Sequence, residues 1–166
     1  KCLLANIPYK IVGGVNFYAR KEIKDLLCYL KTIDNAKDDL AVRRIINVPK
    51  RGIGATTLSR VQDYADQMDI SFYDALRVAE EIPSIGRSLS KIDGFVTFIQ
   101  GLKSKAEAYT VRELLEEVIR LTGYVTELEA EDTEESRARI ENIDELISKT
   151  EAYQEAGEER GEPATL

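Results

Sequence analysis

The sequence contains no histidine, and it has only two cysteines and one methionine. Without histidine the chain cannot form a Ser-His-Asp or Cys-His catalytic centre, nor a zinc site with cysteine and histidine ligands. It also has no Gly-Lys dipeptide, which excludes the Walker A loop that holds nucleotide phosphates. We therefore expect no catalytic residue, no metal site and no bound cofactor, and neither binding nor hydrolysis of ATP by this chain.

The sequence has no apolar run near the roughly 20 residues that cross a membrane. Its first residues, Lys1–Asn6, become polar too early for a signal peptide. Cys2 and Cys28 form no recognisable pair, so a reduced compartment is expected. These features predict a soluble, cytoplasmic protein with no membrane partner. The chain begins without Met, and we interpret it as part of a longer polypeptide.

The basic and acidic residues are unevenly distributed along the chain. Residues 1–60 carry twelve Lys and Arg against five Asp and Glu, a net charge of +7. Residues 61–166 carry eleven against twenty-five, a net charge of −14. This asymmetry predicts a basic surface for a polyanion in the first part, while the acidic remainder limits indiscriminate binding.

A glycine turn flanked by basic residues lies in the stretch Val48–Arg60, VPKRGIGATTLSR. Two glycines let the main chain turn tightly and approach a ligand closely. A β-branched side chain at Gly54 is expected to oppose a positive φ there and to block this approach. The first amides of the next helix are unpaired and carry a partial positive charge, which suits a phosphate. The residues predicted to hold a phosphate are Lys50, Arg51, Gly52, Ile53, Gly54, Thr56 and Thr57. The alternative is a turn that only connects two packed helices, with Ile53 filling the core beneath it.

Hydrophobic periodicity predicts a mainly α-helical chain. One short strand is expected at Ile7–Val12, closed by two glycines. An apolar stripe predicts a helix over about Lys21–Asp34, in which Lys24 and Asp25 are expected on a solvated face or in a weak ion pair. A second helix should begin near Asp38 and end before Pro49.

The helix after the glycine turn should bury one stripe, formed by Leu58, Val61, Ala65 and Met68. A short helix is expected from Ser71 to about Glu80, and a longer one from near Ile85 to Ala108. Thr110 and Glu113 predict a capping box for a helix that Gly123 ends. The six acidic residues within Glu127–Glu135 should lead into a last amphipathic helix, ended by Gly157, Gly161 and Pro163. Its stripe of Ile140, Ile143 and Ile147 makes Ile143-Asp144-Glu145 a helix face and not a Walker B strand.

Three segments follow one another along the chain at characteristic spacing. The first is Ile7–Gly14 (IPYKIVGG) and Phe17–Asp25 (FYARKEIKD), with Tyr29–Lys31 after them; the second is Arg44–Gly54 (RIINVPKRGIG); the third is Arg139–Leu146 (RIENIDEL). In this order they resemble UvrD/PcrA-type superfamily 1 DNA helicases. The first is similar to the family's motif IVa, the second to the segment that follows that motif, and the third to the family's late R-I-E-N-L-x-E-L run.

The resemblance implies a piece of an ATP-dependent motor that separates DNA strands in the 3′ to 5′ direction, whose ATP and Mg²⁺ sites lie elsewhere. Residues 1–30 would be an edge of the RecA-like domain 2A, contributing one short strand and a helix. Residues 31–157 would be the helical 2B domain, and residues 158–166 a polar tail that leads back to 2A. The family's duplex-contacting turn, helix-hairpin-helix-like in character, would correspond to Gly52-Ile53-Gly54, so the resemblance implies duplex DNA as the ligand of this turn and of Lys50, Arg51, Thr56 and Thr57 beside it.

The resemblance also places a group of residues on the single-strand side of motif IVa: Asn16, Phe17, Tyr18, Arg20 and Lys21. Family members often carry a basic residue where this chain has Asn16, which weakens the assignment at that position. Phe17 and Tyr18 are alternatively core or loop anchors. Arg43 and Arg44 fit either a solvated surface or a path along a duplex.

Two functions from different classes fit the sequence. The first is a non-catalytic, regulatory domain that binds duplex DNA without sequence preference, because phosphate contacts carry no sequence information. The second is a helical protein-interaction module whose acidic half docks a repair or transcription protein. Only the first requires an affinity that falls with salt, through counterion release. A glycosylase built on the same turn would need a base-flipping pocket with a catalytic residue, and no such signature is present.

Overall fold

The computed structural model describes residues 15–159, and the side chains of residues 17–152. This part of the chain forms nine α-helices and two 3₁₀ turns, with no β-strand. The prediction of a mainly α-helical fold is therefore confirmed, whereas the strand expected at Ile7–Val12 lies outside the described residues. No helix in the described region has the length and apolar character needed to cross a membrane.

The central helix is α2 (Lys21–Asp34), which follows the short α1 (Val15–Ala19). The predicted bounds of α2 are confirmed. Its buried apolar stripe packs against α3, α6, α7 and α9, so it contacts most of the fold. The stripe consists of Ile23, Leu26, Leu30 and Ile33, all at most 4% exposed. The domain boundary expected after Leu30 falls inside this continuous helix.

Two further helices flank the glycine turn, α3 (Asp39–Ile45) and α4 (Ala55–Met68). The side chain of Asp38 caps α3 by accepting a hydrogen bond from the Ala41 amide. In α4 the predicted stripe holds as far as Ala65, but Met68 is 55% exposed, so its predicted burial is wrong. The helix ends at Met68 because Asp69 adopts the left-handed conformation, which turns the chain away from the helix axis.

The next segment is a short helix, α5 (Phe72–Arg77), followed by the turns η3 (Ala79–Glu81) and η4 (Gly86–Ser88). The long α6 (Leu89–Ala106) begins directly after η4. Ser71 caps α5 through its hydroxyl, as the predicted start of this helix requires.

The chain ends in three helices, α7 (Val111–Thr122), α8 (Tyr124–Glu131) and α9 (Glu134–Glu159). Both hydrogen bonds of the predicted capping box between Thr110 and Glu113 are present, and Gly123 ends α7 with a φ of 68°. The helix α8 was not predicted, because it buries only Leu128 and therefore has almost no apolar stripe. The helix α9 continues through Gly157, where an end was expected.

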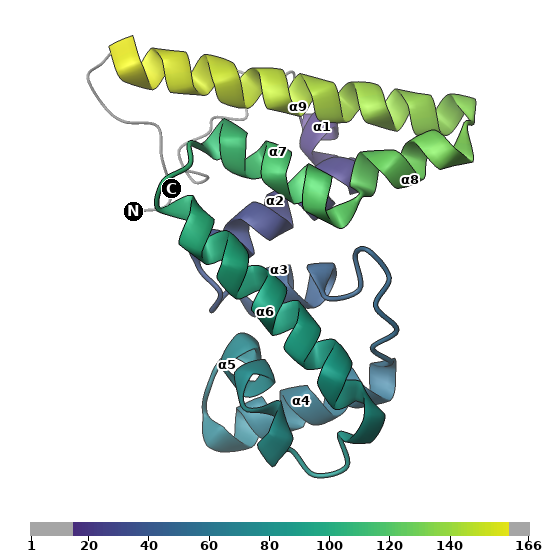
Figure 1. Ribbon diagram of the computed structural model, residues 1–166, viewed down its shortest axis with the longest axis vertical. Coiled ribbons are helices and arrows are strands. Elements are labelled where there is room, and N and C mark those ends of the chain that lie inside the picture. Colours follow the sequence, from purple (N-terminus) through teal and green to yellow (C-terminus); the bar gives the residue numbers. More distant parts are fainter. Residues whose placement is uncertain (1–14, 160–166) are drawn as a thin grey trace.

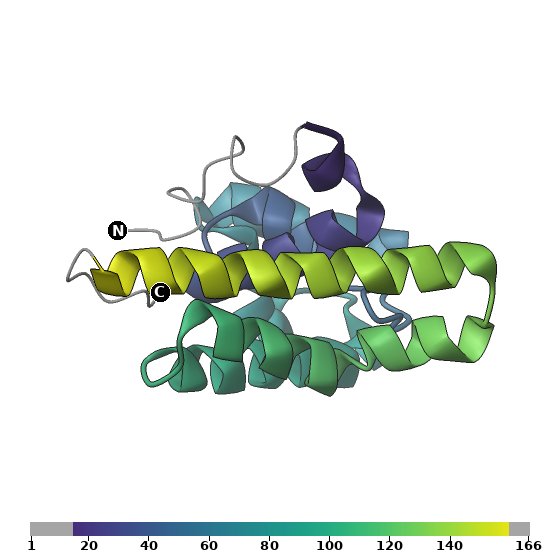
Figure 2. The same ribbon diagram turned by 90° about the horizontal axis from the view of Figure 1, so that it is seen from above.

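The helices form two connected parts (Figure 1). The long α9 lies across one end of the molecule, and α7 and α8 run beneath it. The helix α6 leads away from α7 to the opposite end, where it meets α5 near α4. Seen from above, α7 and α8 lie on one side of α9, with α1 on the other (Figure 2). A single cluster of buried apolar side chains extends from Phe17 to Leu146 and joins both parts.

Candidate nucleic-acid interface

The glycine turn is a closed loop between α3 and α4. The side-chain amide of Asn47 donates a hydrogen bond to the Ile53 carbonyl (2.8 Å) and accepts one from the Ile53 amide (3.1 Å). This pairing fixes Ile53, whose side chain is 3% exposed. It fills the core, as expected for a turn that connects two packed helices. Gly52 and Gly54, on either side of it, are exposed. The loop therefore has an apolar inner face and an outer face of bare backbone.

The two glycines have different roles. Gly52 has a φ of +75°, a conformation that glycine adopts freely, and a Cβ there would meet the Lys91 Nζ at 3.2 Å. Gly54 has a φ of −75° and is the N-cap of α4. Our expectation that a side chain at Gly54 would oppose a positive φ is therefore wrong. A Cβ at Gly54 would meet nothing within 4 Å, so this position keeps open space above the helix start.

The amino end of α4 faces outward without a side-chain cap. The Gly54 carbonyl accepts the first intrahelical bond, from the Leu58 amide at 3.0 Å, so the amides before Leu58 lack intrahelical acceptors. Thr56 is exposed beside these amides. Thr57 instead turns inward, where its hydroxyl lies 3.0 Å from the Ser88 hydroxyl of η4. The structure thus leaves Thr56 at the surface and uses Thr57 to join the turn to η4.

Arg51 points into the protein. Its Nη1 donates to the carbonyls of Ile45 (2.8 Å) and Ile46 (2.9 Å), and its Nη2 donates to the Tyr29 hydroxyl (2.8 Å). Two aromatic rings of α6, Phe95 and Phe98, lie 4.9 and 5.6 Å from the guanidinium carbon. The phosphate contact expected at Arg51 stays a prediction, and the geometry favours an internal role.

Lys50, the neighbour of Arg51, is exposed. Lys91, at the start of α6, donates to the Gly52 carbonyl at 3.2 Å and is also exposed. Arg87 of η4 is exposed next to Ser88, which contacts Thr57. The cations around the turn therefore come from two segments about 40 residues apart. Sequence reasoning missed Lys91 and Arg87, because no local pattern shows that η4 packs beside the turn.

The residues of the motif IVa group have different environments in the structure. Phe17 is 6% exposed and stacks edge-on against Tyr18 at 5.6 Å, so it serves as a core anchor. Arg20 and Lys21 are exposed where α2 begins. The backbone of Asn16 belongs to α1, and its side chain lies outside the described region.

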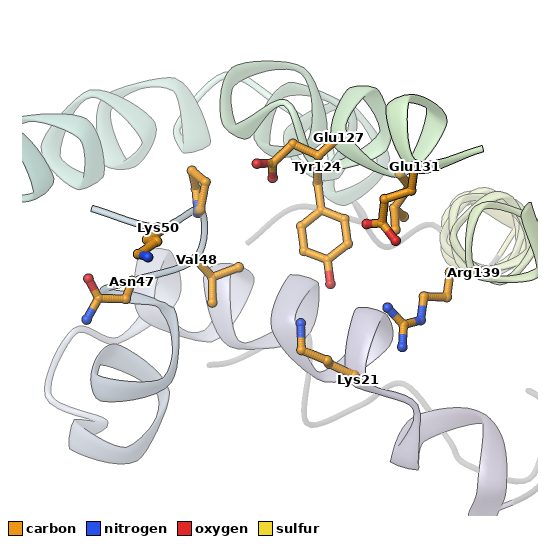
Figure 3. Close-up of a pocket in the computed structure, with 10 residues that line it drawn as sticks. Lys21, Asn47, Val48, Lys50, Tyr124, Glu127, Glu131 and Arg139 are labelled. Carbon is orange, nitrogen blue, oxygen red and sulfur yellow. The ribbon is translucent and has the colours of Figure 1, made fainter. Parts of the chain in front are cut away.

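Lys21 and Lys50 line the same cleft, of about 180 Å³ (Figure 3). Its wall opposite the glycine loop comes from α8, with Glu127 and Glu131 beside Tyr124. The structure thus brings one residue of each predicted group together, although acidic side chains share the space. The lining residues are Lys21, Asn47, Val48, Pro49, Lys50, Tyr124, Glu127, Leu128, Glu131 and Arg139. Among the described residues no cluster of Cys, Asp and Glu is suited to a metal ion.

Comparison with known proteins identifies the family. The model of the UvrD-like helicase C-terminal domain matches residues 3–166, nearly the whole chain. The chain belongs to this family. The ATP-dependent DNA helicase PcrA of Staphylococcus aureus is 46% identical over 151 residues, which is 91% of this chain and 21% of that protein. The PcrA of Staphylococcus epidermidis is 44% identical over 151 residues, with the same shares covered. The chain thus spans about a fifth of the length of these relatives.

This UvrD-like domain holds a buried carboxylate behind the cleft. Asp25 is 1% exposed, so the solvated face, one of its two expected settings, is wrong, whereas the ion pair, the other setting, is present. Its carboxylate accepts hydrogen bonds from the Arg44 Nε (2.9 Å) and the Tyr124 hydroxyl (2.8 Å), and Lys21 lies 3.5 Å away. A carboxylate buried to this extent needs such partners. Arg44, one of two arginines left open by the sequence, therefore ties α3 to α2 instead of facing a ligand.

A second carboxylate on α2, Glu22, is 3% exposed and accepts a hydrogen bond from the Asn142 amide at 2.8 Å. Arg139 lies 4.0 Å from the same carboxylate. Both partners belong to Arg139–Leu146, the run that resembles the late family motif. In this UvrD-like domain the run therefore joins α9 to α2, and it contributes Arg139 to the cleft wall.

Buried tyrosines of this domain predict a loss of stability in alkali. Burial and the hydrogen bond to Asp25 raise the pKa of Tyr124, and burial raises the pKa of Tyr29 and Tyr73. Because the pKa in the folded state exceeds the unfolded value near 10, the stability that the neutral phenols give is complete below about pH 10 and declines above it. We expect the free energy of unfolding to fall between about pH 10 and 12. Urea titrations followed by circular dichroism measure it.

Tyr124→Phe is the matched control, because it removes one titrating phenol with a raised pKa and keeps the ring. Its stability should depend less steeply on pH across the same range. Equal slopes for the parent chain and Tyr124→Phe would contradict the assignment. The charged groups that act on Tyr124 are Asp25, Glu22 and Arg139.

Proposed function

We propose that this chain is the non-catalytic, duplex-binding and regulatory 2B region of an ATP-dependent DNA helicase of the UvrD/PcrA type. Domain 2A would contribute residues 1–30, and residues 158–166 would return to it. The relatives that support the proposal bear the name of ATP-dependent DNA helicases. The parent protein would use ATP with Mg²⁺ and move 3′ to 5′ in the cytoplasm, and its remaining domains would be the first partners of this one.

The observation that carries the proposal is the outer face of the Gly-Ile-Gly turn. It presents exposed backbone at Gly52 and Gly54, the uncapped start of α4, and the exposed Lys50. Open space above Gly54 lets a sugar-phosphate strand approach the amides closely. Lys91, which contacts Gly52, and Arg87 of η4 add two further exposed cations near the turn. A helix-hairpin-helix-like turn of this kind reads backbone geometry, so we expect no sequence preference.

The cleft supports a connection between the turn and the motif IVa side. Lys21 at the start of α2 and Lys50 in the loop line it together. A strand that leaves a duplex held at the turn would pass Lys21 and Arg20 at the surface. Glu127 and Glu131 on the facing wall would repel a phosphate inside the cleft, so we expect the strand to pass at its rim.

Lys50→Ala tests the duplex-binding role. The parent chain is expected to bind a duplex at physiological salt with a Kd of roughly 10⁻⁴–10⁻⁶ M, and its affinity should fall steeply with added salt. Removing one phosphate contact should weaken binding similarly on unrelated sequences and lower the log–log salt slope by about one unit. Fluorescence anisotropy titrations at several salt concentrations measure both quantities.

The matched control is Lys37→Ala, because Lys37 is exposed in the turn before α3, at the end of that helix opposite the glycine loop. It removes the same charge and should leave the slope unchanged if the contact is local. If Lys50→Ala binds like the parent chain with the same slope, the turn does not hold DNA. A protein partner docked on the acidic helices would then be the better function.

A further inference from the structure

The guanidinium of Arg51 contacts several acceptors in the described structure. Besides the carbonyls of Ile45 and Ile46, its Nη1 lies 3.2 Å from the Val48 carbonyl, while Nη2 meets the Tyr29 hydroxyl. These carbonyls end α3, where the helix dipole favours a cation. The rings of Phe95 and Phe98 attract the positive charge further. A phosphate would have to displace several of these partners to reach the guanidinium.

Tyr29 extends the contact to the central helix. Its hydroxyl donates to the Val48 carbonyl and accepts from Arg51, so one side chain of α2 holds the loop at two points. Burial raises the pKa of Tyr29, although Arg51 opposes this, and the hydroxyl therefore keeps the proton that it donates. Arg51 thus links three elements: the carboxyl end of α3, the side of α2 and the rings of α6.

The backbone around Arg51 carries the outward groups of the turn. Lys50 precedes it and is exposed, while Gly52 follows it with a φ of +75°. Because neighbouring residues share peptide planes, an Arg51 side chain fixed inward fixes the direction of Lys50 and of the Gly52–Gly54 backbone. Asn47 holds the other side of the loop through Ile53.

We infer that Arg51 is a positioning residue that preorganises the glycine turn for duplex DNA through its bonds to Tyr29 and the end of α3, without contacting phosphate itself. The inference rests on the proposed function of the turn. It reverses the role that the charge of Arg51 suggests in the sequence, where it stands beside Lys50 as an equivalent base.

Arg51→Lys separates the two roles, because it keeps the charge and loses the planar fork that reaches several acceptors at once. We expect the 166-residue chain with this change to bind a duplex about five- to tenfold more weakly, with the salt slope of the parent chain. Tyr29→Phe, which keeps the ring and removes the bridging hydroxyl, should weaken binding in the same direction with an unchanged slope. The double variant should bind like Arg51→Lys, since both changes break one unit.

Lys50→Ala in the same titrations should lower the slope by about one unit, which marks a direct phosphate contact. If Arg51→Lys binds like the parent chain while Arg51→Ala lowers the slope by one unit, charge alone matters and Arg51 contacts phosphate. That result would overturn the inference and leave the proposed function intact.

Hydrogen exchange of the chain without DNA tests the positioning role of Arg51. In Arg51→Lys and Tyr29→Phe the amides of residues 46–54 should exchange about tenfold faster than in the parent chain, while those of α7 and α9 keep their rates. Loop amides that exchange at the parent rate would overturn the inference even if the chain binds DNA. If the parent chain binds no duplex, the proposed function is overturned. The exchange result then still reports whether Arg51 orders the turn.

Discussion

Asp25→Ala is expected to lower the free energy of unfolding by about 3 kcal/mol. Asp25 is 1% exposed and receives hydrogen bonds from Arg44 and Tyr124. Its removal leaves the Tyr124 hydroxyl without this acceptor and the Arg44 guanidinium without its counter-ion. Breaking a buried pair from one side costs about 3–5 kcal/mol, and the side chain of Arg44 is 34% exposed, which favours the lower end.

Urea unfolding followed by circular dichroism measures this loss. Asp25→Asn keeps the shape and one acceptor oxygen, so it should lose less than Asp25→Ala. Asp144→Ala on the exposed face of α9 is the matched control and should change stability by no more than about 0.5 kcal/mol. A loss below about 1 kcal/mol for Asp25→Ala would mean that water replaces the missing carboxylate, and that the cluster does not hold α3 and α8 to α2.

The parts of the fold that local chemistry dictates could be predicted from the sequence. The bounds of α2 follow from its apolar stripe, and the start of α7 follows from the Thr110 capping box. Asp38 and Ser71 cap helices by accepting hydrogen bonds from amides three residues later, and this spacing is visible in the local sequence. The helix α8 was missed because it has one buried residue and follows α7 after a single glycine.

Contacts between distant segments could not be predicted. Asp25 reads as one more charge on a helix, and only the approach of Tyr124, 99 residues later, makes it a buried acceptor. The inward turn of Arg51 likewise depends on Tyr29 and on rings of α6. At the glycine turn a positive φ was expected at Gly54 but is adopted by Gly52, since either glycine of the motif can adopt it.

Ile53→Ala is expected to destabilise the chain by about 3 kcal/mol, within the range of about 2–5 kcal/mol for removing a large aliphatic side chain from a core. Ile53 is 3% exposed, and Asn47 holds its backbone on both sides, so the loop cannot shift freely to fill the cavity. Ile53→Val removes one methylene group and should lose about 1 kcal/mol. Urea unfolding of the three chains checks this order, and equal stabilities would show that Ile53 does not anchor the loop.

Gly54→Ala, one residue after Ile53, tests duplex binding at a position where the substitution should hardly change stability. Its added methyl meets nothing within 4 Å and the φ of −75° suits alanine, so stability should change by less than about 1 kcal/mol. The same methyl would stand where a strand approaches the first amides of α4, and duplex affinity should therefore fall. If a folded Gly54→Ala chain binds a duplex as well as the parent chain does, the strand does not approach Gly54 closely. A weaker affinity at unchanged stability would assign the outer face of the turn to the ligand and its inner face, through Ile53, to the core.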